Sequence, residues 1–223
     1  MRATASLVVL LAICSPALAQ RDDNERFGRP LMTPDNLADM SLGRFAFCAE
    51  ARAQATAAKV LQTRLASDEE AKQVRKLAAV NRECSPLYPM PFTPTAVRNA
   101  LATIAYRRNH KSGDVPPPTP AGTPPPASFA VVPADANGTD QQQGAWYLGA
   151  IANCVVFVDP PAVHRLVTGP IDVPEEDKRF AALVPAIGRC SPSDTSGLTV
   201  RRFRGYLANA LLQHVGDGAK MKD

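Results

Sequence analysis

The sequence LGRFAFC at residues 42–48 has a counterpart, LGAIANC, at residues 148–154. Shifting the chain against itself by 106 positions, without a gap, aligns these stretches and places CSP at residues 84–86 on CSP at residues 190–192. The sequence therefore predicts a tandem duplication of one module. Further pairs under the same shift include Glu69 with Glu175, Glu70 with Glu176, Lys72 with Lys178, Arg98 with Arg204 and Leu101 with Leu207.

Helical periodicity near the start of each copy predicts a first helix, for which Asp35 is a candidate N-cap. A second helix, rich in alanine, lysine and glutamine, should cover residues 51–66. Pro160-Pro161 in the second copy suits a helix start but not a helix interior, so we expect a break between these two helices in both copies. The apolar residues expected inside from the first helix are Leu37, Met40, Leu42, Phe45, Ala46 and Ala49.

A third helix should begin after Ser67, whose hydroxyl can cap it, and should end at the CSP stretch, where proline stops it. A fourth opens at Thr93-Pro94, or at Thr199 in the second copy. We therefore expect an all-α fold made of two modules, each with about four helices. The side chains expected inside are Val74, Leu77, Val80, Val97, Leu101, Ile104 and Ala105, then Phe180, Leu183, Val184, Ile187, Phe203, Leu207, Ala210 and Leu211.

The first nineteen residues are typical of a secretory signal peptide, with Arg2, a short apolar run and Ala17-Leu18-Ala19 before an expected cleavage at Gln20. A lipoprotein cleavage box ending at Cys14 is the alternative, but the bulky Ile13 argues against it. The mature chain should then be periplasmic or secreted. No second apolar run is long enough to span a membrane. The net charge of +4 is too weak to require nucleic acid or an anionic membrane as partner.

Four cysteines remain after removal of the leader, and an even number in an exported chain favours disulfides. Each copy holds two cysteines 36 positions apart, and a module that folds by itself must close its bond within itself. We therefore expect disulfides Cys48–Cys84 and Cys154–Cys190. Each would stabilise the fold by about 3–4 kcal/mol on the chain-entropy model. The chain has no C-x-x-C motif, so these cysteines are interpreted as structural rather than as metal or redox sites.

Proline accumulates between the two copies, at residues 116–118, 120, 124–126 and 133, which predicts an extended spacer. Its apolar residues Phe129, Val131 and Val132 either dock on a module or stay exposed. The expected division is a signal peptide at 1–19, a flexible arm at 20–34, helical module 1 at 35–110, the Pro-rich linker at 111–143, helical module 2 at 144–215 and a disordered tail at 216–223.

The sequence contains few candidates for catalytic or metal-binding residues. His110, His164 and His214 are not spaced as ligands on one helical turn and are interpreted as solvated surface residues. The paired glutamates at residues 69–70 and 175–176 suit acid–base catalysis, but their place in a helix first turn explains them through the dipole. No catalytic residue, metal site or cofactor is therefore assigned.

Arg98 and Arg204 are the most informative polar residues because they match between the copies. Each guanidinium could pair with a carboxylate of its own module, from the acidic turn of the third helix, or mark a pocket for an anionic ligand. Two basic clusters with aromatic neighbours, at residues 106–111 and 201–206, could bind phosphates, although solvated helix ends have the same composition.

The leader, the L-G-x-x-x-x-C helix, the cysteine spacing and the closing RGYLANAL of residues 204–211 resemble a group of small exported bacterial proteins without an assigned function. The likeness is stronger in the second copy, since Asn99 stands in the first where Gly205 stands in the second. This resemblance implies a location in the bacterial envelope and carries no catalytic residue with it.

The sequence as a whole favours a non-enzymatic helical binding or interaction protein of the periplasm, with an unknown protein or envelope component as partner. Two linked modules could engage two sites on one partner. One alternative is a cell-envelope hydrolase that uses a paired glutamate. The other is a cationic binder of anionic lipid or nucleic acid that acts through Arg201, Arg202 and Arg204.

Overall fold

The computed structural model describes residues 34–84, 92–116, 138–171, 174–191 and 198–220, and side chains within them from 37 to 214. All regular secondary structure in these ranges is helical, which confirms the all-α class. The expected signal peptide, most of the arm and most of the linker lie outside the described residues.

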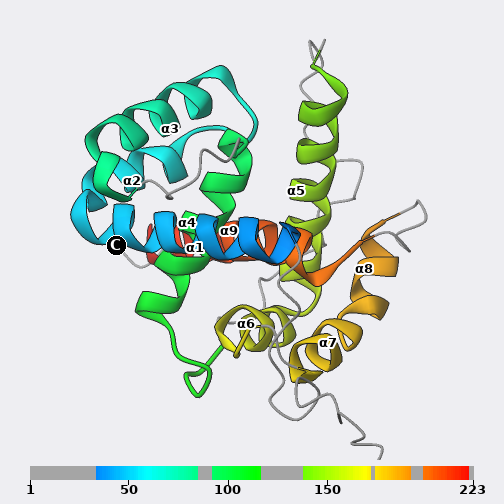
Figure 1. The fold of residues 1–223 in the computed structure, drawn as a ribbon. Helices are drawn as coiled ribbons and strands as arrows, with labels where there is room; N and C mark the ends of the chain where they lie inside the picture. The colour runs from blue at the N-terminus through cyan, green and yellow to red at the C-terminus, as the bar shows by residue number, and fades with distance from the viewer. Residues whose placement is uncertain (1–33, 85–91, 117–137, 172–173, 192–197, 221–223) are drawn as a thin grey trace, which may run out of the picture. The chain divides into compact units, whose positions relative to one another are not determined.

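The helices follow one another in two comparable sets (Figure 1). The first set is α1 (Pro34–Arg52), α2 (Gln54–Gln62), α3 (Asp68–Val80), the short 3-10 helix η1 (Arg82–Cys84) and α4 (Pro94–Asn109). The second set is α5 (Asp140–Val158), α6 (Pro160–Thr168), α7 (Pro174–Ala181), α8 (Val184–Cys190) and α9 (Val200–Lys220).

The helix starts follow local capping chemistry. The hydroxyl of Ser67 accepts from the backbone N–H of Glu70 at 3.1 Å, and that of Thr93 accepts from Ala96 at 3.2 Å. The expected break between the first two helices of each copy falls at Ala53 and at Asp159, and the Asp159 carboxylate caps α6. The helix α1 begins at Pro34, so Asp35 lies in its first turn and is not its N-cap.

Other predicted boundaries are wrong. Residues 140–143, assigned to the linker, form the first turn of α5 because Thr139 and Gln142 make a capping box. Residues 216–220, assigned to the tail, belong to α9. The third helix of the second copy splits into α7 and α8, because Pro185 cannot donate to the carbonyl four residues earlier and clashes with it.

Several side chains predicted to be buried are at the surface. Val80 in the last turn of α3 is 66% exposed, and Val184 at the start of α8 is 53% exposed. Leu37 and Met40 of α1 are 41% and 40% exposed, whereas Phe45 of the same helix is buried. Periodicity identifies an apolar stripe but does not show how far along the helix a packing partner extends.

The two disulfides pair as the sequence predicts. Cys48–Cys84 joins α1 to η1 with a Cα–Cα distance of 5.6 Å, and Cys154–Cys190 joins α5 to α8 with 5.7 Å. Each spans 36 residues. The cysteine of the first helix is thus linked to the end of the third predicted helix in both halves.

The halves contact each other mainly through α4 and α9, which make the most extensive helix–helix contact (Figure 1). Ala102 and Tyr106 of α4 belong to the same buried cluster as the core of the second half. The helices approach each other closely where Asn99 faces Gly205, two positions that the 106-residue shift superimposes. The two halves therefore share a core across this crossing.

Replacing Gly205 by alanine should destabilise the protein. A Cβ atom there would lie 2.4 Å from the Asn99 Cβ and 3.1 Å from its Cα, so the helices must separate. We expect a loss of about 1–3 kcal/mol in the free energy of unfolding, measured with urea, despite the higher helix propensity of alanine. Gly144→Ala in α5 is the matched control, since among the described residues the added Cβ would meet nothing within 4 Å beyond its chain neighbours and the backbone of its own helix. A neutral or stabilising Gly205→Ala would contradict the close crossing.

Candidate functional site

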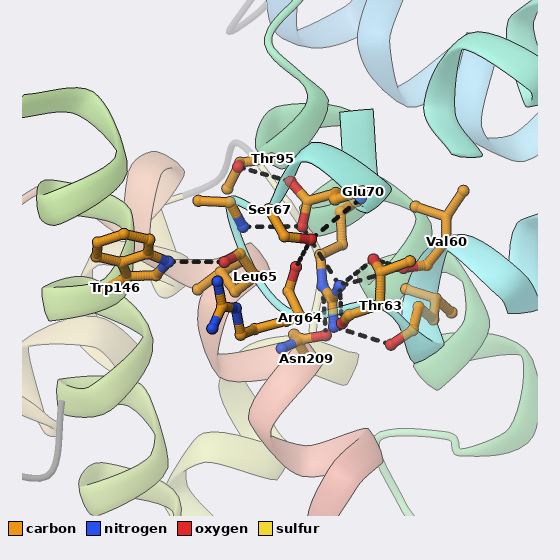
Figure 2. Close-up of polar contacts among 12 residues, drawn as sticks. Val60, Thr63, Arg64, Leu65, Ser67, Glu70, Thr95, Trp146 and Asn209 are labelled. Atoms are coloured by element: carbon orange, nitrogen blue, oxygen red, sulfur yellow. Dashed lines mark hydrogen bonds and ion pairs between the residues drawn. The ribbon is translucent and has the colours of Figure 1, made fainter. Parts of the chain in front are cut away.

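Arg98 of α4 is fully buried and lies between α2, α3 and α9. Its guanidinium donates to the carbonyl oxygens of Val60 at 3.1 Å, Leu61 at 2.8 Å and Thr63 at 2.6 Å. The last carbonyls of a helix have no partner within the helix. Arg98 therefore caps the C-terminal end of α2, where the helix dipole also favours a cation. Figure 2 shows the polar contacts around this site.

Glu70 of α3 is the counter-charge of Arg98. Its Oε2 atom lies 3.3 Å from the Arg98 Nη1 and accepts from the backbone N–H of Ala66 at 3.1 Å. Its Oε1 accepts from the Thr95 hydroxyl at 2.7 Å. Both carboxylate oxygens are thus engaged, and the side chain has no solvent exposure. Burial lowers the pKa of Arg98, and Glu70 opposes this decrease.

Residues of the second half complete this site. The Arg98 Nε donates to the Asn209 Oδ1 of α9 at 3.1 Å. The turn between α2 and α3 receives a bond from the Trp146 indole to the Leu65 carbonyl at 2.8 Å and one from Gln142 to the Ala66 carbonyl at 3.1 Å. Figure 2 shows Trp146 reaching this turn from α5. Ala66 has a φ of 55°, a conformation that such surrounding contacts must hold in place.

The second half has a comparable pair. Arg204 of α9 forms an ion pair with Glu176 of α7, and both side chains are buried. These residues match Arg98 and Glu70 under the shift. Each arginine thus lies against the acidic turn that the sequence offered as its partner. Because Arg204 is buried, it is not part of an exposed basic cluster with Arg201 and Arg202.

The other two matched glutamates are exposed. The Glu69 Oε2 lies 3.5 Å from the Lys72 Nζ, and the Glu175 Oε1 lies 3.9 Å from the Lys178 Nζ. Each of these pairs lies in the first turns of its own helix. A hydrogen bond from Gln73 lowers the pKa of Glu69, and the nearby lysines act in the same direction. Such a carboxylate stays ionised at neutral pH, which suits helix capping better than a general acid.

His164 of α6 is fully buried, so its interpretation as a surface residue is wrong. Its Nε2 lies 3.1 Å from the Lys111 carbonyl, and its Nδ1 lies 2.8 Å from the Tyr106 hydroxyl. A carbonyl only accepts, so Nε2 carries the proton and the Tyr106 hydroxyl donates to Nδ1. His110 stacks on Tyr106 with ring centroids 4.4 Å apart. Sequence reasoning missed this link between the halves because no local pattern pairs residues of α4 and α6.

Burial shifts both members of the Tyr106–His164 pair towards their neutral forms. It raises the pKa of Tyr106 and lowers that of His164 below the usual 6.5, with His110 and Arg165 acting in the same direction on His164. The Lys111 carbonyl and Asp114 oppose the decrease at His164. The pair is therefore a neutral hydrogen-bonded link in a buried contact.

The described residues contain neither a metal-binding cluster nor a single helix that could span a membrane. No group of three or more histidine, cysteine, aspartate or glutamate side chains in these ranges could hold a metal ion. No single helix there is long and apolar enough to cross a membrane, and only α5 and α6 taken together pass that test, with a bend of 114° between them.

Comparison with protein-family models, with characterised proteins and with solved structures finds no match to this chain. The resemblance to small exported bacterial proteins therefore stays a prediction.

Replacing Arg98 by lysine should strongly destabilise the protein. An ammonium group cannot reach the carbonyls of α2, Glu70 and Asn209 together, so buried acceptors lose their donors. We expect a loss of about 3 kcal/mol or more in the free energy of unfolding. Arg52→Ala is the control, because the Arg52–Glu83 pair is largely exposed and should contribute at most about 1 kcal/mol. Equal effects of the two variants would contradict the role given to Arg98.

The stability of the protein should decrease on mild acidification because of His164. Its folded-state pKa lies below the unfolded value, so the unfolded chain binds the proton first. The contribution of His164 to the free energy of unfolding is fully present above about pH 6.5. It is lost as the pH falls from there to the folded-state pKa. His164→Gln should flatten the pH dependence of urea-derived stability between about pH 7 and pH 5. An unchanged slope in His164→Gln would show that other groups cause it.

Proposed function

We propose that this protein is an exported, non-enzymatic helical binding protein of the bacterial envelope. The observation that carries this proposal is that the two matched arginines form ion pairs with two of the matched glutamates. Arg98 with Glu70 and Arg204 with Glu176 are buried ion pairs, while several large apolar side chains remain exposed. A protein of this kind offers surface for recognition rather than a polar site for chemistry.

Export is supported by the leader-like residues 1–19 and by the two disulfides, which persist in oxidising compartments such as the periplasm. We also infer that the halves arose by duplication. The equal disulfide spans, the matched ion pairs and the contact of positions 99 and 205 support this origin. The likeness to small exported bacterial proteins is part of the same proposal.

The alternative of a cell-envelope hydrolase has less support. A general acid or base must reach the proton it transfers, and Glu70 and Glu176 are buried against arginines. Of the four matched glutamates, Glu69 and Glu175 are exposed, and each lies beside a lysine of its own helix.

The alternative of a cationic surface binder also has less support. Arg204 is buried, Arg201 lies 3.7 Å from Asp39, and Arg108 forms an ion pair with Glu50. These pairs reduce the uncompensated positive charge that phosphates would attract.

The proposed function can be tested with the mature chain, residues 20–223, immobilised and exposed to envelope extract of the organism that encodes it. We expect saturable retention of a defined protein that persists at about 0.5 M salt, where long-range charge attraction is screened. The retained protein should be chemically unchanged. Binding that disappears at this salt concentration would indicate a cationic binder instead. Turnover of envelope material that is lost in a Glu69→Gln, Glu175→Gln double variant would indicate an enzyme.

A further inference from the structure

The helix α1 carries apolar residues on two opposite faces. Its inner face packs into the first core through residues such as Phe45 and Ala49, which are 5% and 0% exposed. A second stripe is formed by Leu37, Met40 and Phe47, which are 41%, 40% and 64% exposed. With Arg44, these residues follow the spacing i, i+3, i+7 and i+10, and at 100° per residue they lie within about 80° of one another. We call these four residues the outer face of α1.

One position of the outer face, Met40, has a covered counterpart in the second half. Met40 corresponds to Trp146 under the 106-residue shift, and Leu65 corresponds to Ile171. Trp146 is 8% exposed and bonds to the Leu65 carbonyl, so α5 is packed on the first half there. Met40 and Ile171 are instead 40% and 42% exposed. Trp146 is thus covered by the turn at Leu65, whereas the corresponding residues Met40 and Ile171 are exposed.

The charges of α1 indicate the chemistry of a partner. From residue 37 onward its other charged side chains are engaged, since Asp39 lies near Arg201, Glu50 pairs with Arg108 and Arg52 pairs with Glu83. Among the described residues, none forms an ion pair with Arg44, which lies between the apolar residues of the outer face. A carboxylate on the partner would complement this cation.

The outer face is also preorganised, which reduces the entropy lost on binding. The Cys48–Cys84 disulfide fixes α1 to η1, and the Glu50–Arg108 pair fixes it to α4. Helices recognise one another through apolar residues that share one face at helical spacing, and the apolar residues of the outer face share one face in this way.

We propose that the outer face of α1 docks an amphipathic helical segment of a partner protein, with apolar side chains against Leu37, Met40 and Phe47 and a carboxylate against Arg44. This inference rests on the proposed binding function and names its surface and the chemistry of its partner. It requires an exposed Phe47 and an accessible Arg44, and both side chains are exposed.

The test is selection of a displayed library of helical peptides, about 15 residues long to allow four turns, on the mature oxidised chain. The peptides carry apolar residues at helical spacing and random residues elsewhere. We expect enrichment of peptides with aspartate or glutamate within the apolar stripe. Their affinity should fall about tenfold or more in Phe47→Ser and in Arg44→Glu. Exchanging the peptide carboxylate for lysine should restore affinity to Arg44→Glu but not to the wild type.

Val80→Ser is the matched control, because Val80 is equally exposed on α3 and lies outside the outer face. It should bind the selected peptides as the wild type does. Both outer-face changes are at exposed positions, and circular dichroism with a non-reducing peptide map checks that each variant is folded. Met40→Ser provides a second apolar variant.

Three outcomes would overturn the proposal. Selected peptides whose binding is independent of Phe47 and Arg44 would place the site elsewhere. Self-association of the wild type that is lost in Phe47→Ser would make the outer face a contact between copies of this chain. Phe47-dependent binding to phosphatidylglycerol vesicles would make it a lipid contact.

If an envelope protein still binds Phe47→Ser and Arg44→Glu, this inference fails while the proposed function stands. Salt-sensitive binding or turnover would instead remove the proposed function.

Discussion

The first half of this protein depends on one constraint, which is that the positively charged side chain of Arg98 is buried away from solvent. Arg98 is buried, and a buried guanidinium costs several kcal/mol unless its donors find acceptors. Here those acceptors come from the end of α2, from Glu70 of α3 and from Asn209 of α9. The position of α4 thereby fixes the turn that joins α2 and α3. The same bonds commit α9, from the other half of the chain, to that position.

A second buried pair, Arg204 with Glu176, performs the corresponding role between α9 and α7. In each half, a disulfide joins the first helix to the segment that precedes the last helix. The halves then meet where α4 and α9 cross at Asn99 and Gly205, and Tyr106 and His164 add a neutral bond between α4 and α6. Because these contacts cross the midpoint of the chain, separation of the halves would expose shared core as well as buried polar groups.

This use of the polar groups bears on function. The matched arginines and two of the matched glutamates stabilise the interior, so they are not displayed to a substrate. A partner must therefore recognise other residues, which lie on the surface of the protein. The outer face of α1 combines exposed apolar side chains with Arg44 on a helix held by a disulfide, which favours recognition of another helix.

The sequence alone determined the helical class, most helix starts and the disulfide pairing, because caps, proline positions and cysteine spacing act locally. It also offered the correct partners for Arg98 and Arg204, in the acidic turns of α3 and α7. Only the tertiary structure decided that His164 is buried, that Arg98 reaches Asn209 and that Leu37, Met40, Val80 and Val184 are exposed. The physical reason is that periodicity reports which side of a helix is apolar. Which apolar side finds a partner depends on contacts between distant residues, such as the 111 positions between Arg98 and Asn209.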